Sequence, residues 1–125
     1  KQSPKKINLN NIGNYISRLG TISISKITTF VEFKNKEGIC LPLDYCKKLK
    51  LVKWNYGDKC TSSSNSTLNV SDIFINNKLS FFDKQHYPLI KYLTTIIWIP
   101  GLFHAKIPNI NKNKRYIVLR WSPLL

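Results

Sequence analysis

Residues 109–121 read NINKNKRYIVLRW, and this stretch changes character halfway along. Its first part is polar and cationic, whereas its second part is β-branched and apolar and ends in Arg-Trp. β-branched and aromatic residues favour strands, so we expect a loop at 109–114 and a strand at 115–121. Because side chains alternate across a strand, this one should present two faces: Arg115, Ile117, Leu119 and Trp121 on one, and Tyr116, Val118 and Arg120 on the other.

The chain upstream predicts a β-hairpin. Thr21–Phe33 is rich in Thr, Ser, Ile and Val and should form a long strand. Lys34–Gly38 is a short turn that ends in glycine, and Ile39–Leu43 returns as a second strand. Residues 21–43 therefore predict two antiparallel strands that pair with each other.

Later segments alternate turns with short apolar runs. Asn55–Asp58 predicts a turn, and the polar stretch Thr61–Asn69 predicts a loop. Ile73–Phe82 predicts a tight hairpin around Asn76-Asn77, since asparagine tolerates positive φ. Tyr87–Ile99 is mainly apolar and could be helix or strand, and residues 94–99 favour a strand at its end.

Two short helices are expected. Ile12, Tyr15, Ile16 and Leu19 have helical spacing, which predicts a helix within residues 7–19 that ends at Gly20. Asp44 is a suitable N-cap for a second helix over Asp44–Leu51. The sequence therefore predicts a mainly β (α+β) fold, a small barrel or half-open antiparallel sheet with one or two short helices. Residues 1–6 should form a basic arm, and residues 7–125 a single domain.

Charge is the strongest functional signal. Lysine and arginine total 20 and acidic residues total 6, which gives a net charge of +14. From Lys84 to Leu125 the chain has seven cationic side chains and no carboxylate, so cations there cannot pair with acids in the same segment. A domain with this surplus repels itself when alone, which indicates a polyanionic partner, with nucleic acid favoured.

Two groups combine cations with aromatic rings. Lysines neutralise phosphates and exposed rings stack on unpaired bases, so the combination favours RNA over a regular DNA duplex. The alternative is that Trp54 and Trp121 are core residues with lysines around them. The predicted nucleic-acid-binding residues are Lys47, Lys48, Lys50, Lys53, Trp54 and Tyr56 in the first group, and Lys112, Lys114, Arg115, Tyr116, Arg120 and Trp121 in the second.

A local resemblance supports a second nucleic-acid hypothesis. Residues 38–51, GICLPLDYCKKLKL, followed by Gly57-Asp58, resemble the strand–Leu-Pro–short helix–Gly-Asp segment of small swapped-hairpin and B3-like DNA-binding barrels. The gap before Gly57 is longer than in the swapped-hairpin pattern. The resemblance covers only this segment, and it implies a sequence-specific DNA-binding β-barrel as the alternative.

Catalytic and metal-binding signals are weak. The carboxylates are scattered, so we expect no enzyme, with a nuclease that uses His86 or His104 as a general base as the alternative. Cys40, Cys46 and Cys60 lack the closely spaced pair of a zinc knuckle. We therefore expect buried free thiols, and no metal or cofactor.

The favoured function is a non-enzymatic RNA-binding domain, a small component of a larger nucleoprotein assembly such as a ribosome-like particle, with other proteins of that assembly as partners. We expect no transmembrane segment, because Tyr92–Phe103 is too short to span a bilayer. The protein is expected inside the cell, with an organelle as one option. The acceptor patterns at Asn65 and Asn69 keep a secreted, basic interaction glycoprotein as a further alternative.

Overall fold

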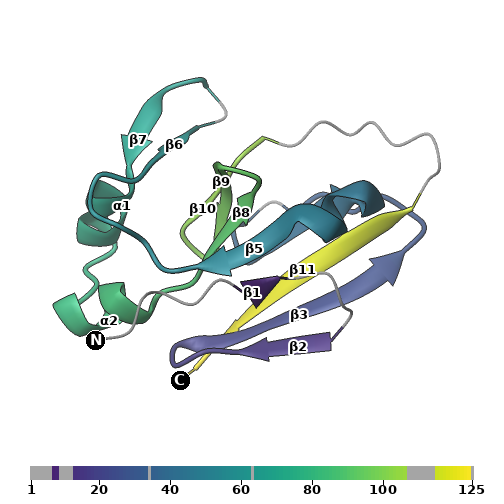
Figure 1. Ribbon diagram of the computed structural model, residues 1–125, viewed down its shortest axis with the longest axis horizontal. Helices are drawn as coiled ribbons and strands as arrows, with labels where there is room; N and C mark the ends of the chain where they lie inside the picture. Colours follow the sequence, from purple (N-terminus) through teal and green to yellow (C-terminus); the bar gives the residue numbers. More distant parts are fainter. Residues whose placement is uncertain (1–6, 9–12, 34, 63, 107–114, 125) are drawn as a thin grey trace.

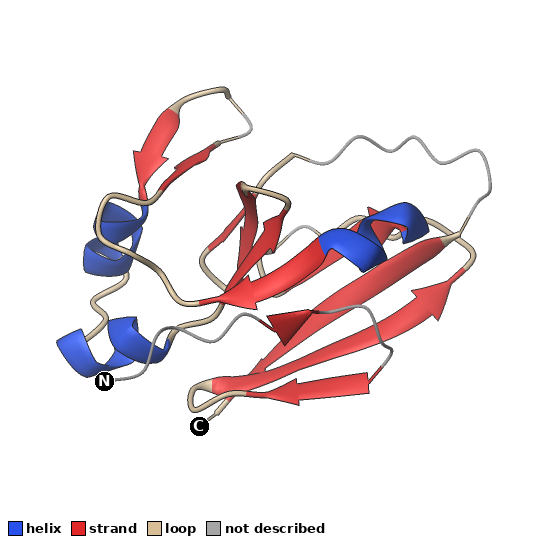
Figure 2. Cartoon of the chain, viewed as in Figure 1, coloured by secondary structure: helices blue, strands red, loops and turns tan. Residues whose placement is uncertain are grey.

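The computed structural model describes residues 7–8, 13–33, 35–62, 64–106 and 115–124, and for residues 7–8 it describes the backbone only. Two antiparallel sheets dominate it (Figures 1 and 2). The four-stranded sheet has the order β2 (Gly13–Ile16), β3 (Gly20–Ile27), β11 (Tyr116–Pro123) and β4 (Gly38–Pro42). The five-stranded sheet has the order β1 (Ile7–Asn8), β5 (Leu49–Val52), β8 (Leu89–Tyr92), β9 (Thr95–Ile99) and β10 (Phe103–His104).

Shorter elements complete the fold. β6 (Lys59–Thr61) and β7 (Thr67–Asn69) form a small ribbon, so the two ends of the predicted loop at 61–69 are strands. The helices are η1 (Leu43–Lys48, a 3-10 helix), α1 (Val70–Asn76) and α2 (Phe81–His86). Across the described residues the sheets do not close into a barrel, so the prediction of a mainly β fold with a half-open sheet is confirmed.

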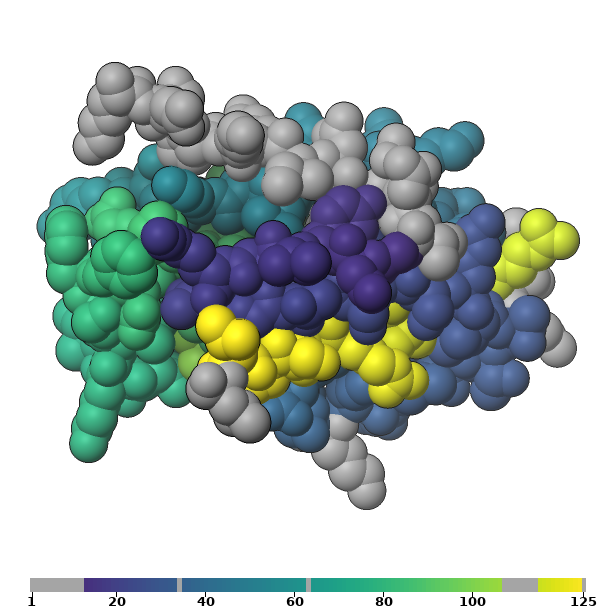
Figure 3. All heavy atoms as spheres, turned by 90° about the horizontal axis from the view of Figure 1, so that it is seen from below, coloured from purple at the N-terminus to yellow at the C-terminus, as the bar shows by residue number. Residues whose placement is uncertain are grey.

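β11 is the central strand of the four-stranded sheet. It pairs with β3 from Tyr116–Ile27 to Pro123–Gly20, and on its other side with β4. Its predicted alternation is confirmed: Ile117, Leu119 and Trp121 face the five-stranded sheet, whereas Tyr116 and Val118 belong to a cluster on the outer face. Figure 3 shows the yellow C-terminal segment alongside the purple-to-blue N-terminal part of the chain, where β3 lies between β11 and β2. Apolar contacts on both faces explain why this strand is a nearly continuous apolar run.

The main core lies between the two sheets. Ile22, Leu41 and Leu119 from the four-stranded sheet belong to one cluster with Ile90 and Trp98 from the five-stranded sheet. The Trp98 indole N–H donates to the carbonyl of Lys36 at 2.9 Å, and the Gly101 N–H donates to the same carbonyl at 2.7 Å. The Lys36 carbonyl therefore links the loop between β3 and β4 to β9 and to the turn that follows it.

A second core covers the other face of the five-stranded sheet. Val70 and Phe74 of α1 are fully buried there, one helical turn apart, against Leu89 and Ile99. This packing explains why the hairpin predicted over Ile73–Phe82 is wrong. The segment instead contains the end of α1, a turn and the start of α2, where the Ser80 hydroxyl accepts a hydrogen bond from the Asp83 N–H at 3.1 Å.

Three other local predictions are wrong, and the first two fail for reasons of tertiary pairing. The predicted helix within residues 7–19 is replaced by β1 and β2, because Tyr15 pairs with Ile22 and packs on the main core. Both strands of the predicted hairpin at 21–43 form, although the first ends at Ile27 and not at Phe33, and β11 lies between them. Asp44 lies in the first turn of η1 and does not cap it, and η1 is a 3-10 helix that ends at Lys48.

Other local predictions are confirmed. The turn at Asn55–Asp58 is closed by the Asp58 N–H, which donates to the Asn55 carbonyl at 3.0 Å. Tyr87–Ile99 ends in a strand, β9, which pairs with β8. The predicted arm at 1–6 and the loop at 109–114 lie outside the described residues. Within the described part of the chain, none of the helices has the length and apolar character needed to cross a membrane.

Candidate nucleic-acid interface

The first predicted group lies on η1, β5 and the turn that follows. Lys47 and Lys48 are exposed at the end of η1. Lys50 is exposed on β5 because its neighbours Leu49 and Leu51 point into the main core. Lys53 follows β5 and is also exposed. All four lysines are therefore available to a partner.

Lys91 joins this group although its position in the sequence does not reveal it. Lys91 on β8 lies directly opposite Lys50 on β5 in the antiparallel register. Side chains that are directly opposite lie on the same face of the sheet, and like charges there destabilise the pair. An anion bound between them would remove that repulsion. The lack of acidic residues in the final third of the chain hinted that Lys91 has no carboxylate nearby, but only the strand register shows that it lies opposite Lys50.

The structure also brings Arg115 to the start of η1. The Leu43 N–H donates to the Arg115 carbonyl at 3.0 Å, which connects η1 to β11. A cavity of about 260 Å³ lies at this junction, and Lys26, Thr28 and Arg115 are among its lining residues. At the other end of η1 the Leu93 N–H donates to the Lys48 carbonyl at 3.3 Å. We name the cations on and beside η1 the η1 cluster: Lys26, Lys47, Lys48, Lys50, Lys91 and Arg115.

Carboxylates do little to neutralise the η1 cluster. Asp44 is the only acidic residue of η1 itself. Among the described residues, no lysine of the cluster forms an ion pair with a carboxylate. Lysines without a carboxylate partner favour the approach of anions from solution.

The aromatic residues of the first group differ in exposure. The Trp54 ring is half-buried and lies edge-on to Phe74, with ring centroids 5.6 Å apart. The Tyr56 ring is 92% exposed. Gly57 follows it at a φ of +94°, and the Asn55 N–H donates to the Asp58 carboxylate at 2.7 Å. This closed turn holds Tyr56 out from the surface, where its ring could stack on a base.

The second predicted group divides between surface and core. Arg115 and Arg120 are exposed, and the Arg120 guanidinium lies 5.2 Å from the centre of the Phe33 ring. Tyr116 and Trp121 are each only 7% exposed because they lie on the central strand. Little of either ring is therefore exposed for stacking on a base. Lys112 and Lys114 lie outside the described residues.

The cysteines are buried in three separate clusters. Cys46 lies in the main core, Cys60 in the core beneath α1, and Cys40 on the outer face of the four-stranded sheet. Burial raises the pKa of all three thiols, and that of Cys60 to about 11. Neutral thiols are poor metal ligands and poor nucleophiles. Within the described residues, no three potential metal ligands lie together.

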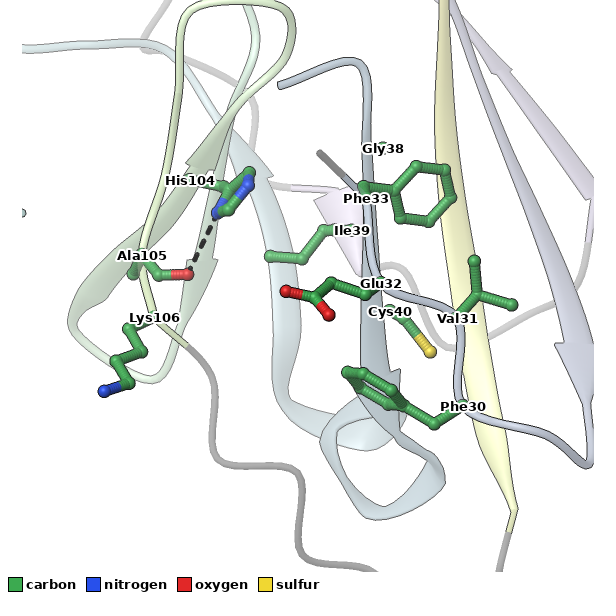
Figure 4. A pocket seen from close by; sticks show the side chains of 10 residues that line it. All are labelled: Phe30, Val31, Glu32, Phe33, Gly38, Ile39, Cys40, His104, Ala105 and Lys106. Carbon is green, nitrogen blue, oxygen red and sulfur yellow. Dashed lines mark hydrogen bonds between the residues drawn. The ribbon is translucent and has the colours of Figure 1, made fainter. Parts of the chain in front are cut away.

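The two histidines have different surroundings. The His86 ring packs on Phe82, with centroids 4.5 Å apart. His104 lines a cavity of about 360 Å³ together with Glu32 and Lys106 (Figure 4). Both asparagines of the glycosylation patterns, Asn65 and Asn69, are exposed.

The segment that resembles DNA-binding barrels forms strand, short helix and strand, as the resemblance implies. These elements are β4, η1 and β5. However, β4 and β5 belong to different sheets, and no barrel closes around them in the described part of the chain. The resemblance is therefore restricted to local structure.

Comparison with known proteins identifies a fold. No family model matches the sequence, and no curated protein matches it significantly. The structure is similar to the crystal structure of a TILS C-terminal domain, with a TM-score of 0.84 and 17% sequence identity. The match covers 98% of this chain and 99% of that chain. The likeness therefore extends over the whole arrangement of sheets and helices, and the chain shares the fold of that domain.

Proposed function

We propose that this domain binds RNA, mainly through the sugar-phosphate backbone, with the η1 cluster as the principal contact. The observation that carries the proposal is the concentration of cations on and beside η1, where Lys50 and Lys91 oppose each other on adjacent strands. Opposed cations on a small domain are destabilising unless an anion lies between them. A polyphosphate chain supplies such anions at regular spacing.

RNA is favoured over duplex DNA because an exposed ring accompanies the cations. Tyr56 lies in the same stretch as Lys50 and Lys53 and offers a face to an unpaired base. Single strands and irregular RNA surfaces present such bases, whereas a regular duplex hides them. The fold shared with a TILS C-terminal domain is compatible with this proposal. A place within a larger nucleoprotein assembly would suit a charge of +14.

The test is the salt dependence of RNA binding, measured by fluorescence anisotropy on a single-stranded RNA. Each phosphate contact contributes about 0.7 to the slope of log affinity against log salt. The triple variant Lys47→Gln, Lys48→Gln, Lys50→Gln should therefore reduce the slope by about 2. Failure of the wild-type protein to bind at low salt would defeat the proposal.

A matched control separates local contact from net charge. Arg18, Lys78 and Lys84 lie in or near the α1–α2 region, and the Arg18 guanidinium lies 5.2 Å from the centre of the Phe82 ring. The variant Arg18→Gln, Lys78→Gln, Lys84→Gln removes the same charge and should leave the slope unchanged. Equal losses in both variants would mean that charge alone drives binding. A strong preference for one DNA sequence over random duplex would favour the DNA-binding alternative.

A second candidate function is RNA cleavage, because the larger cavity brings an imidazole, a carboxylate and an ammonium together. His104, Glu32 and Lys106 all line it, and these groups can act as general acid or base. His86, which packs on Phe82, lies elsewhere. Denaturing gels of the same binding reactions test this candidate. Cleavage that is lost in His104→Ala and retained in His86→Ala would support it, and intact RNA would refute it.

A further inference from the structure

The larger cavity lies beside the edges of the two sheets. Its walls come from the segment 30–33, from Gly38–Cys40 of β4, and from His104–Lys106 at the end of β10. The Trp121 N–H donates to the Glu37 carbonyl at 2.8 Å, which helps to fix the loop between these walls. At about 360 Å³ the cavity is within the range of small-ligand sites, near the lower limit.

The walls combine aromatic rings with hydrogen-bond acceptors. Figure 4 shows the Glu32 carboxylate directed toward His104 and Ala105 on the opposite wall, with the Phe30 ring nearby. The His104 Nδ1 lies 3.2 Å from the Ala105 carbonyl. Because a carbonyl only accepts, this contact requires the proton on Nδ1, and a neutral ring would then have Nε2 as an acceptor. Both polar walls therefore favour a ligand that donates hydrogen bonds.

Glu32 stands apart from most of the acidic residues of the chain. The Asp58 and Asp72 carboxylates accept local hydrogen bonds, from the Asn55 N–H and the Asn69 amide. Asp44 and Asp83 lie in the first turns of η1 and α2. Within the described residues, the Glu32 carboxylate has no hydrogen bond or ion pair. A carboxylate retained in so basic a domain, without a structural partner, is suited to a ligand.

Two cations lie beside the cavity. Lys106 is exposed at its wall, and Arg120 lies over Phe33, another lining residue. The Phe33 ring can approach β4 closely because Gly38 has no side chain: a Cβ there would meet the ring at 2.3 Å. A nucleotide whose base entered the cavity would therefore have cations available for its phosphates.

We propose that this cavity binds one unpaired base of the RNA, with guanine preferred. Guanine presents two adjacent N–H donors, from N1 and N2, which match the two oxygens of one carboxylate. Adenine and cytosine place a ring acceptor beside their amine, and uracil flanks its single N–H with two carbonyls. Either arrangement repels a carboxylate. This inference rests on the proposed function, because the base arrives as part of a bound RNA.

The experiment compares two single-stranded RNAs, a short oligouridine and the same oligomer with one central guanosine. The wild-type protein should bind the guanosine oligomer about tenfold more tightly, the size expected of one bidentate pair. Glu32→Gln should abolish this difference. Glu37→Gln is the matched control, since it removes the same charge from the neighbouring loop outside the cavity lining, and it should retain the tenfold preference.

The outcomes separate the two proposals. Salt-dependent binding of both oligomers with equal affinity would overturn the guanine site and leave RNA binding intact. A preference that survives Glu32→Gln would also overturn the site. If neither oligomer binds even at low salt, both proposals fall. Both glutamates are exposed, so each variant should keep the thermal midpoint of the wild-type protein, which circular dichroism can check.

Discussion

The two basic–aromatic groups look alike in sequence and differ in structure. In the first group the cations and Tyr56 all lie on the surface around η1 and β5. In the second group the arginines are exposed, but Tyr116 and Trp121 are buried on the central strand. Composition therefore does not decide whether an aromatic ring is exposed to a ligand or fills a core. The strands on either side of the ring's own element decide whether the ring is buried.

The buried ring of the second group should matter most for stability. Trp121→Ala should lower the free energy of unfolding by about 3–5 kcal/mol, because it empties a large volume in the main core. Tyr56→Ala should change stability by less than about 0.5 kcal/mol, since the ring is exposed. Urea unfolding monitored by circular dichroism measures both.

RNA affinity should respond to the exposed ring. If Tyr56 stacks on a base, Tyr56→Ala weakens binding of single-stranded RNA by about 1–3 kcal/mol. Tyr56→Phe keeps the ring and should keep most of the affinity. The contrast between the two groups would break down if Tyr56→Ala unfolded the domain while Trp121→Ala left it stable.

An intermediate effect should appear at high pH in the buried region. The Tyr87 ring packs on Trp121, with centroids 5.9 Å apart. Burial raises the pKa of Tyr87 from its ordinary 10.0 to about 12. Above pH 10 the unfolded chain therefore loses this proton while the folded chain keeps it, so stability falls as the pH rises. The loss from this group approaches roughly 2 kcal/mol by about pH 12.

Tyr87→Phe isolates this titration from that of the lysines, which lose their charge in the same pH range. Urea unfolding of both proteins at about pH 9 and about pH 11 gives two stability differences. The variant should lose less stability than the wild-type protein over this interval. Equal losses would show that the phenol does not titrate late in the folded state.

The smallest effect concerns the opposed lysines of the surface region. Lys91→Gln removes the repulsion with Lys50 and should raise stability by about 0.5 kcal/mol at low salt. The gain should disappear at high salt, where screening weakens the repulsion. The same variant should weaken RNA binding. Lys84→Gln on α2 serves as the control, and a gain of the same size there would show that only net charge matters.

The sequence revealed some features of the fold because they are local. The alternation along β11 was readable because Ile117 and Leu119 are separated by one residue, and the turn at Asn55–Asp58 because its residues are turn formers. The buried thiols followed from the absence of a close cysteine pair. The exposed lysines of the first group were also found. Their arrangement around η1 could not be predicted, because it depends on the pairing of distant strands.

The features that were missed depend on residues distant in the chain. β11 lies between β3 and β4, so the local signal for a hairpin at 21–43 was misleading. Lys91 meets Lys50 only through the pairing of β5 with β8. Glu32 and His104 line the same cavity because the edges of the two sheets lie side by side there, and nothing near either residue in the sequence indicates this proximity. Such contacts need the tertiary structure.

The position of β11 has a consequence for biosynthesis. It is the last described strand to be made, yet the four-stranded sheet is built around it. A nascent chain that stops before residue 116 has the flanking strands β3 and β4 but nothing to join them, and it leaves Ile22 and Leu41 without their partner Leu119. The ribosome must release this strand before the native sheet can form. Until then the chain exposes unpaired strand edges, which are prone to aggregation. Folding is also slowed because β11 must pair with strands that are distant in the sequence.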